Sequence, residues 1–549
     1  MRRLIRLVLG LSLSLSLACG DEPGSDVGDS GVGDSGVGAQ DVPALDGRVS
    51  PAEDASADVE SEPPGTIVMT QSGPVEGVDD GQVLHYFGIP YAAPPLGLRR
   101  FLGPEPMPPW TEPLDASSFG PECPQRDRDD GVVVGEEDCL QLNIWAPSAP
   151  GPHPVMLWLH GGAFIQGSAT TGLYDGSVFA AAGDVVVVSV NYRLGALGFL
   201  AHEALVDEAG TAGNYGLLDQ VAALEWLQTN IASFGGDAGN VTVFGESAGG
   251  SSICALLGMP VADGLFHKAI IQSGGGCNGY PNLNAGTNPA TEVGTSIALA
   301  AGCRGSADEV RSCLRDSPVE TLIDAQFMSG SSGLGLPPLG PNVDGVHFPR
   351  VTYERIADGE GPRRPIITGS NADESRTFVA SVPVPDLGAY ETLVRGAFGA
   401  IADDILELYR AADFDSPKLA YEAVVSDVAF ICSALSFARA AEAADHPVYS
   451  YHYVHLFNGL LGRRGALHGA ELFPLFEGWG LIPAYTPVEA DLELGNAMQT
   501  HWRSFAHTGN PGTDWPAYPS IRSLAIPLSN TDNIRQGRCE ELRALGVVR

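Results

Sequence analysis

The sequence contains a glycine and serine motif with the spacing of a catalytic nucleophile. Residues 241–250 read Val-Thr-Val-Phe-Gly-Glu-Ser-Ala-Gly-Gly, so Ser247 stands in G-x-S-x-G between Gly245 and Gly249. A β-branched run precedes the motif and a helix-compatible run, 251–257, follows it. A sharp strand-to-helix turn leaves no room for side chains at the two glycines and exposes the serine hydroxyl. Ser247 is therefore the predicted nucleophile.

A second glycine motif lies upstream and would serve the same chemistry. His160–Phe164 reads His-Gly-Gly-Ala-Phe directly after the apolar run Val155–Leu159, and it resembles the HGGG-type loop of esterases and lipases. We expect the backbone amides of Gly162, Ala163 and Ala248 to form an oxyanion hole, which holds the negative charge of a tetrahedral intermediate. An ordinary turn after a strand would look similar, but the nucleophile motif favours the oxyanion interpretation.

A serine hydroxyl needs a base, and the base needs a carboxylate to orient it. Among twelve histidines, His468 is favoured because it lies in the glycine-flanked loop 465–472 after a strand-like run. Asp373 and Glu374 both follow another strand-like run, and the order serine, acid, histidine is that of α/β-hydrolases. The residues alone leave open which of the two acids acts, because most loop carboxylates are merely solvated.

Strands and helices alternate along the chain. Helical spacing of apolar residues occurs around 221–231 and from about 416 to 443. The alternation predicts a mostly parallel central sheet flanked by helices, with the reactive site at the carboxyl ends of the strands. The expected strands are Val155–Leu159, Val185–Val190, Val241–Phe244, Ile270–Gln272, Pro365–Thr368 and Val448–Tyr453.

The N-terminus resembles an export signal. Residues 1–19 place Arg2, Arg3 and Arg6 before an apolar run that ends in Ser-Leu-Ala-Cys19, which resembles the lipobox of bacterial lipoproteins. Cys19 is thus the predicted lipid anchor, although plain secretion stays open because a serine stands where leucine is commonest. We therefore expect an exported protein, either a cell envelope lipoprotein or a secreted one.

Residues 20–65 differ in composition from the rest of the chain. They are rich in Gly, Ser, Pro, Ala and acids, contain no aromatic residue and carry a net charge of −11. Such a segment is expected to be a disordered, extended tether. The whole chain carries a net charge of −37. With +3 in the leader and −11 in the tether, a net charge of −29 remains for residues 66–549. That charge makes nucleic acid an unsuitable partner, and the lack of a second break predicts one large domain with insertions.

Nine cysteines in an exported chain favour disulfides. No C-x-x-C pair occurs, so we expect neither a metal nor a cysteine redox motif, and the chemistry needs no cofactor. With Cys19 set aside, the other eight cysteines allow 105 complete pairings, and their spacing does not choose among them.

Further blocks make the chain similar to the type B carboxylesterase and cholinesterase family over nearly all of residues 66–549. The family's histidine and glutamate blocks imply His468 and favour Glu374 over Asp373 as the catalytic acid. The resembling blocks are Phe87–Pro95, Trp110, Glu137–Asn143, Asn191–Arg193, Asp219–Gln220, Phe234–Asp237 and Gln272–Gly274.

The resemblance also implies the disulfides and the residues around the triad. It pairs Cys123 with Cys139, Cys303 with Cys313, and Cys432 with Cys539, and it leaves Cys254 and Cys277 as buried thiols. It implies that Glu246, Ser273 and Glu471 support the triad, although each could instead be an ordinary buried polar group.

The function implied is that of a monomeric serine carboxylesterase that hydrolyses small-molecule carboxylic esters through an acyl-enzyme. It would meet a membrane only through a lipid at Cys19. Two alternatives stay open, a lipase for longer-chain esters and a non-catalytic adhesion or storage relative, and the intact triad disfavours the second. Cholinesterases resembled here stack choline on a tryptophan, where this chain has Asp129, and no residue between Cys123 and Cys139 is aromatic.

Overall fold

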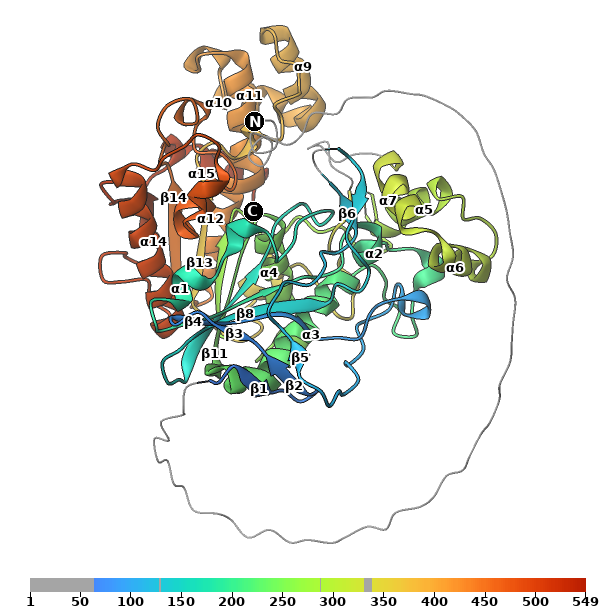
Figure 1. Cartoon of the computed structure of the whole chain (residues 1–549). Coiled ribbons are helices and arrows are strands. Elements are labelled where there is room, and N and C mark those ends of the chain that lie inside the picture. The colour runs from blue at the N-terminus through green and yellow to red at the C-terminus, as the bar shows by residue number, and fades with distance from the viewer. Residues whose placement is uncertain (1–63, 128–129, 287, 330–337) are drawn as a thin grey trace. The chain divides into compact units, whose positions relative to one another are not determined.

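An eleven-stranded sheet forms the centre of the fold (Figure 1). The computed structural model describes residues 64–549 except 128–129, 287 and 330–337. The predicted leader, Cys19, Asp129 and nearly all of the predicted tether lie outside the described residues. The sheet order is β16-β15-β14-β13-β12-β11-β9-β10-β8-β4-β3.

The six predicted strands are confirmed, and they lie side by side in the middle of the sheet. All of them pair in parallel, as expected for apolar runs that are buried on both faces. They are β9 (His153–Leu159), β10 (Val186–Val190), β11 (Gly236–Glu246), β12 (Lys268–Gln272), β13 (Ile366–Asn371) and β14 (Val448–Tyr453).

The outer strands were not predicted, because their polar residues hide the pattern and three of them are short. β15 continues the parallel pairing on β14, while the remaining pairs toward both edges are antiparallel. These strands are β3 (Val78–Asp79), β4 (Val83–Pro90), β8 (Gln141–Pro147), β15 (Ile521–Leu524) and β16 (Ser529–Thr531). Two small sheets stand apart, formed by β1 (Ile67–Met69), β2 (Pro74–Glu76) and β5 (Leu114–Asp115), and by β6 (Gln125–Arg126) and β7 (Val133–Val134).

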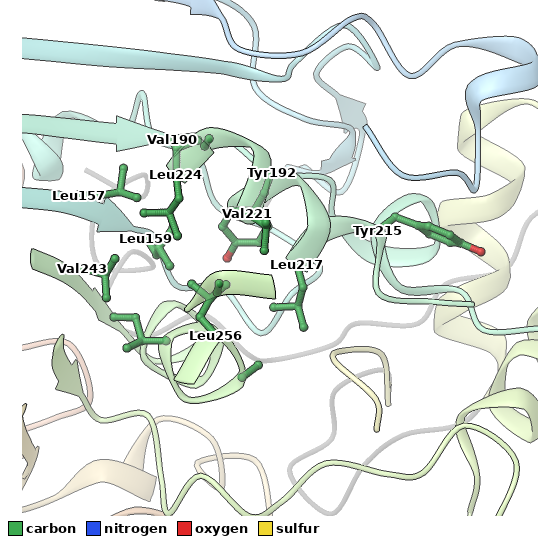
Figure 2. Packing of buried hydrophobic residues seen from close by; sticks show 14 of the residues in the cluster. Leu157, Leu159, Val190, Tyr192, Tyr215, Leu217, Val221, Leu224, Val243 and Leu256 are labelled. Atoms are coloured by element: carbon green, nitrogen blue, oxygen red, sulfur yellow. The ribbon is translucent and has the colours of Figure 1, made fainter. Parts of the chain in front are cut away.

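Helices cover both faces of the sheet, because alternate strand residues point to opposite sides. One face packs against α3 (Tyr215–Asn230), α4 (Ala248–Gly258) and α12 (Cys432–Ala443). Figure 2 shows this core, where Leu157 and Leu159 of β9 meet Leu224 of α3 and Leu256 of α4. The other face packs against α1 (Ser177–Ala180), α13 (Leu472–Leu475) and α14 (Glu489–Thr508). The nucleophile helix α4 thus packs on the sheet and also contacts α3 and α8 (Thr352–Ala357).

The remaining helices are insertions around this frame. A separate hydrophobic cluster joins α9 (Leu387–Phe398), α10 (Ala402–Leu408), α11 (Pro417–Ser426) and α15 (Arg538–Ala544). The predicted helical stretch 416–443 is confirmed as α11 and α12 joined by a π-helical turn, Asp427–Ile431. This stretch is long and apolar enough to cross a membrane, but 67% of its most apolar window is buried, as in a core helix. The others are α2 (Gly195–Phe199), α5 (Ala290–Ala300), α6 (Ala307–Asp316), α7 (Val319–Met328) and α8 (Thr352–Ala357).

The described residues contain four disulfides, and three of them match the pairs that the resemblance implies. The fourth joins Cys254 and Cys277, so the prediction of two free thiols is wrong. Cys254 lies in α4, which packs on β12, and the loop after β12 folds back over the helix and brings Cys277 to a Cα separation of 5.0 Å. No local spacing signals this contact, because it depends on how the loop returns.

We expect loss of the Cys432–Cys539 bridge to cost more stability than loss of the Cys303–Cys313 bridge. The first closes a loop of 107 residues and the second one of 10. Loop-closure entropy then predicts losses of about 4.8 and about 2.7 kcal/mol. Thermal unfolding of the two double Cys→Ser variants measures the order, and an equal or reversed order would contradict the loop-length argument.

Candidate active site

Ser247 lies in a tight turn between β11 and α4, as the sequence predicts. Its backbone has φ 57° and ψ −120°, a conformation that only a strained turn imposes on a residue with a side chain. A Cβ atom on Gly249 would lie 1.9 Å from the Leu159 carbonyl oxygen, and one on Gly245 would lie 2.6 Å from the same atom. Both glycines are therefore required for the close approach of β9 to the turn.

The predicted oxyanion loop lies against the serine. A Cβ atom on Gly161 would lie 3.1 Å from the Cβ of Ser247. Gly162 and Ala163 have φ values of 118° and 56°, which turn the loop back after β9. Within the described residues, the amides of Gly162, Ala163 and Ala248 have no hydrogen-bond acceptor. The arrangement leaves three donors beside the serine, the last at the start of α4.

His160, the first residue of this loop, is held in place by packing contacts. Its ring stacks on Tyr192 with 4.4 Å between ring centroids, and its Nδ1 lies 2.9 Å from the Gly161 carbonyl oxygen. Burial lowers the pKa of His160 to about 4, so its imidazole is neutral at neutral pH. The histidine of the loop is thus held as a packing group.

His468 and Glu374 form a direct hydrogen bond. Nδ1 of His468 lies 2.5 Å from Glu374 Oε2, and the carboxylate is fully buried. Its other oxygen accepts hydrogen bonds from the Ser273 hydroxyl at 2.6 Å and the Asn371 amide at 2.7 Å. Asp373 turns away instead and binds the Ala466 amide. The structure therefore brings Glu374, and not Asp373, to the histidine.

Two further carboxylates act on the same imidazole through their charge. Glu246 Oε1 lies 3.0 Å from His468 Nε2, and both side chains are almost completely buried. Glu471 is buried, accepts a hydrogen bond from the Asn371 side-chain amide and lies 3.4 Å from Gln272 Nε2. The three residues predicted to support the site, Glu246, Ser273 and Glu471, are thus gathered around it.

These carboxylates govern the protonation of the site. Burial alone lowers the pKa of His468, but the negative charges of Glu246, Glu374 and Glu471 outweigh burial and raise it to about 9. Burial, together with the charges of the two neighbouring glutamates, raises the pKa of Glu471 to about 8. The cluster therefore favours a cationic imidazole and a neutral Glu471 carboxyl group.

Sequence reasoning missed the aromatic contacts of His468. The ring centroids of Phe378 and Phe430 lie 4.8 and 5.1 Å from the imidazole. Phe378 follows Glu374 by four residues, so its closeness to the predicted acid in the sequence could have indicated this contact. Phe430 lies in the π-helical turn, and nothing in the sequence indicates its contact with the histidine. Among the described residues, no cluster of His, Cys, Asp or Glu is suited to hold a metal ion.

Comparisons with known proteins identify the family of this chain. A model of the carboxylesterase family matches residues 64–541. The chain is 36% identical to the fumonisin B1 esterase of Sphingopyxis macrogoltabida, over 84% of this chain and 86% of that one. It is also 36% identical to the para-nitrobenzyl esterase of Bacillus subtilis (strain 168), over 82% and 92% of the two chains.

An acetylcholinesterase of Bungarus fasciatus is 35% identical over 86% of this chain and 85% of that protein. Among solved structures, a PNB esterase superposes with a TM-score of 0.77 at 34% identity and covers 87% of this chain and 99% of its own. Relatives of this identity share the fold along almost their whole lengths. The chain therefore belongs to the carboxylesterase family and is a serine carboxylesterase with the α/β-hydrolase fold.

Proposed function

We propose that Ser247, His468 and Glu374 form a catalytic triad that hydrolyses carboxylic esters through an acyl-enzyme. The observation that carries the proposal is the buried 2.5 Å hydrogen bond between His468 and Glu374, with Glu246, the residue before Ser247, 3.0 Å from His468 Nε2. A carboxylate at Nδ1 fixes the tautomer in which Nε2 is free to accept a proton.

In the first half of the reaction, His468 takes the proton of Ser247 as the serine oxygen attacks the ester carbonyl carbon. The amides of Gly162, Ala163 and Ala248 hold the charge on the carbonyl oxygen. The tetrahedral intermediate collapses, the bond to the alcohol oxygen breaks, and the imidazolium returns its proton to that oxygen. The acyl group stays on the serine.

In the second half, water replaces the alcohol and loses its proton to the same imidazole. Attack on the acyl carbon forms a second intermediate, which releases the carboxylic acid and restores the serine hydroxyl. Glu374 stabilises the imidazolium in both halves, and Glu246 lies near enough to add to that stabilisation. Ser273 holds the carboxylate of Glu374 in place.

The proposal predicts an unusually alkaline pH profile. Only the neutral imidazole accepts the serine proton, so kcat/KM should be low below the pKa of His468 and rise through about pH 9. An unperturbed histidine would give a midpoint near about 6.5. Glu246→Gln removes a negative charge 3.0 Å from Nε2 and should move the midpoint to lower pH by about one pH unit or more.

The surface variant Glu489→Gln is the matched control and should leave the midpoint unchanged. A wild-type midpoint near 6.5, or the same midpoint in Glu246→Gln, would contradict the role of the carboxylate cluster. The measurement is kcat/KM for a neutral ester from pH 5 to 10.5.

The substrate class we propose is small carboxylic esters. The relatives named above include esterases for fumonisin B1, para-nitrobenzyl esters and acetylcholine, so ester hydrolysis is the activity they share. A panel of p-nitrophenyl esters of graded chain length, beside a serine-reactive phosphonate, tests it. Hydrolysis that the phosphonate abolishes supports the proposal, a preference for long chains supports the lipase alternative, and a lack of any turnover supports the non-catalytic one.

We also propose that the enzyme does not prefer choline esters. Without a contact between the substrate cation and an aromatic ring, the binding free energy is weaker by about 0.5 to 2 kcal/mol. This corresponds to at most about thirtyfold in preference for the cation. We therefore expect kcat/KM values for acetylcholine and its uncharged analogue 3,3-dimethylbutyl acetate to lie within about tenfold of each other. A preference for acetylcholine well above thirtyfold that persists at high salt would show a cation site elsewhere.

Export and lipid attachment at Cys19 remain proposals from the sequence. Membrane partition of the wild-type protein, compared with a Cys19→Ser variant, distinguishes a lipoprotein from a secreted enzyme.

A further inference from the structure

Two leucines are exposed on the loop between β14 and His468, and neighbouring residues anchor this loop to the core. Leu456 is 53% exposed and Leu460 is 77% exposed. The residues next to them point inward, because Phe457 and Leu461 both pack against the core that contains α13 and α14. Phe457 lies between Phe473, Trp479 and Tyr485, with ring centroids 5.6 to 6.3 Å away. The inward pair anchors the loop while the outward pair meets solvent.

The backbone of this loop is closed on itself. A Cβ atom on Gly462 would lie 1.9 Å from the Phe457 carbonyl oxygen, so the two ends of the tip are in contact. Arg376 donates a hydrogen bond of 2.7 Å to the carbonyl of Arg464, which ties the loop to the turn that follows Glu374. Because the tip is already ordered, binding through it would cost little conformational entropy.

Two exposed arginines follow the leucines directly. Arg463 and Arg464 lie at the solvent surface, and within the described residues neither guanidinium pairs with a carboxylate. Most other arginines of this acidic domain do pair, including the half-buried Arg439 and the exposed Arg543, both with Glu540. Adjacent free guanidinium groups are unusual in a domain that carries −29.

We propose that the segment Leu456–Arg464 is a docking surface for an anionic phospholipid bilayer. The leucines would enter the boundary between headgroups and acyl chains, and the two arginines would bind lipid phosphates. The rest of the domain is acidic and is repelled by such a surface, so the segment also sets which face of the molecule approaches the lipid. Arg464 lies four residues before His468 in the chain, which would present the active-site loop to the bilayer.

The test measures binding to vesicles and does not depend on catalysis. The protein is the chain from Gly20 onward, which keeps every described element and its core and omits the apolar leader and Cys19. Sedimentation with vesicles of 70% phosphatidylcholine and 30% phosphatidylglycerol gives the partition coefficient. We expect Leu456→Ser with Leu460→Ser to lower it at least tenfold, and Arg463→Gln with Arg464→Gln to lower it about twenty-five-fold, at about fivefold for each arginine.

Leu98→Ser is the matched control, because Leu98 is 79% exposed and lies in the turn Gly97–Arg99, which contacts α6. It should bind as the wild type does. Wild-type binding that is absent at millimolar lipid, equal on pure phosphatidylcholine, or equally reduced by Leu98→Ser would overturn the proposal. A wild-type dimer that the double leucine variant loses would assign the surface to a second copy of the chain. Hydrolysis of soluble esters by all variants keeps this test separate from that of the proposed function.

Discussion

Replacement of Ser247 by alanine should lower kcat for a soluble ester by about 10⁵- to 10⁶-fold, because the attacking oxygen is lost. The rate that remains comes from the oxyanion hole and from substrate binding, and should exceed the rate in water by about 10³ to 10⁴. Alanine fits the turn, since Ser247 contributes no side-chain hydrogen bond that caps α4. The fold should therefore survive the change.

Ser296→Ala provides the control, since Ser296 is half-buried on α5 and its hydroxyl bonds only within that helix. Burst kinetics with a p-nitrophenyl ester should show one acyl-enzyme per active site in this control and none in Ser247→Ala. A folded Ser247→Ala protein that keeps more than about one hundredth of the wild-type rate would remove the serine from the mechanism.

The central sheet and the placement of Ser247 followed from the sequence because both depend on local patterns. Buried parallel strands are short apolar runs, and the nucleophile turn needs its two glycines wherever β9 approaches it. The outer strands β4 and β8 mix polar and apolar residues and were missed. Their pairing is set by neighbours distant in the chain.

The choice between the two candidate acids could not be made from local sequence patterns. Asp373 and Glu374 are adjacent, similar in charge and equally placed after β13, so the residues alone could not choose between them. The choice depends on the direction of each side chain, which is set when β12 delivers Ser273 and the loop after β14 delivers Ala466. The family resemblance supplied the answer that the local chemistry could not.

The electrostatic environment of His468 could not be predicted from the sequence either. Glu246 precedes the serine, and Glu471 follows the histidine by three residues, so both were expected nearby. Their closeness and burial follow from packing between α13, β13 and the nucleophile turn. The consequence is a histidine whose pKa is raised to about 9.

Glu374→Gln should lower kcat about 10⁴-fold, while the neighbouring Asp373→Asn should change it less than about threefold. The glutamine keeps the volume of the side chain and can still accept the hydrogen bonds of Ser273 and Asn371 through its oxygen. Its NH₂ group would then face Nδ1 of His468 and donate to it. That arrangement stabilises the tautomer with the proton on Nε2, which cannot take a proton from Ser247, and it removes the charge that stabilises the imidazolium.

Asp373→Asn is the matched variant, because it makes the same chemical change one residue earlier. It weakens the half-exposed ion pair with Arg376, for which a stability loss of at most about 1 kcal/mol is expected. Single-turnover acylation rates, with circular dichroism to confirm folding, separate the two variants. Equal losses in both, or a Glu374→Gln enzyme that keeps a tenth of its activity, would show that the buried hydrogen bond to His468 does not orient the base.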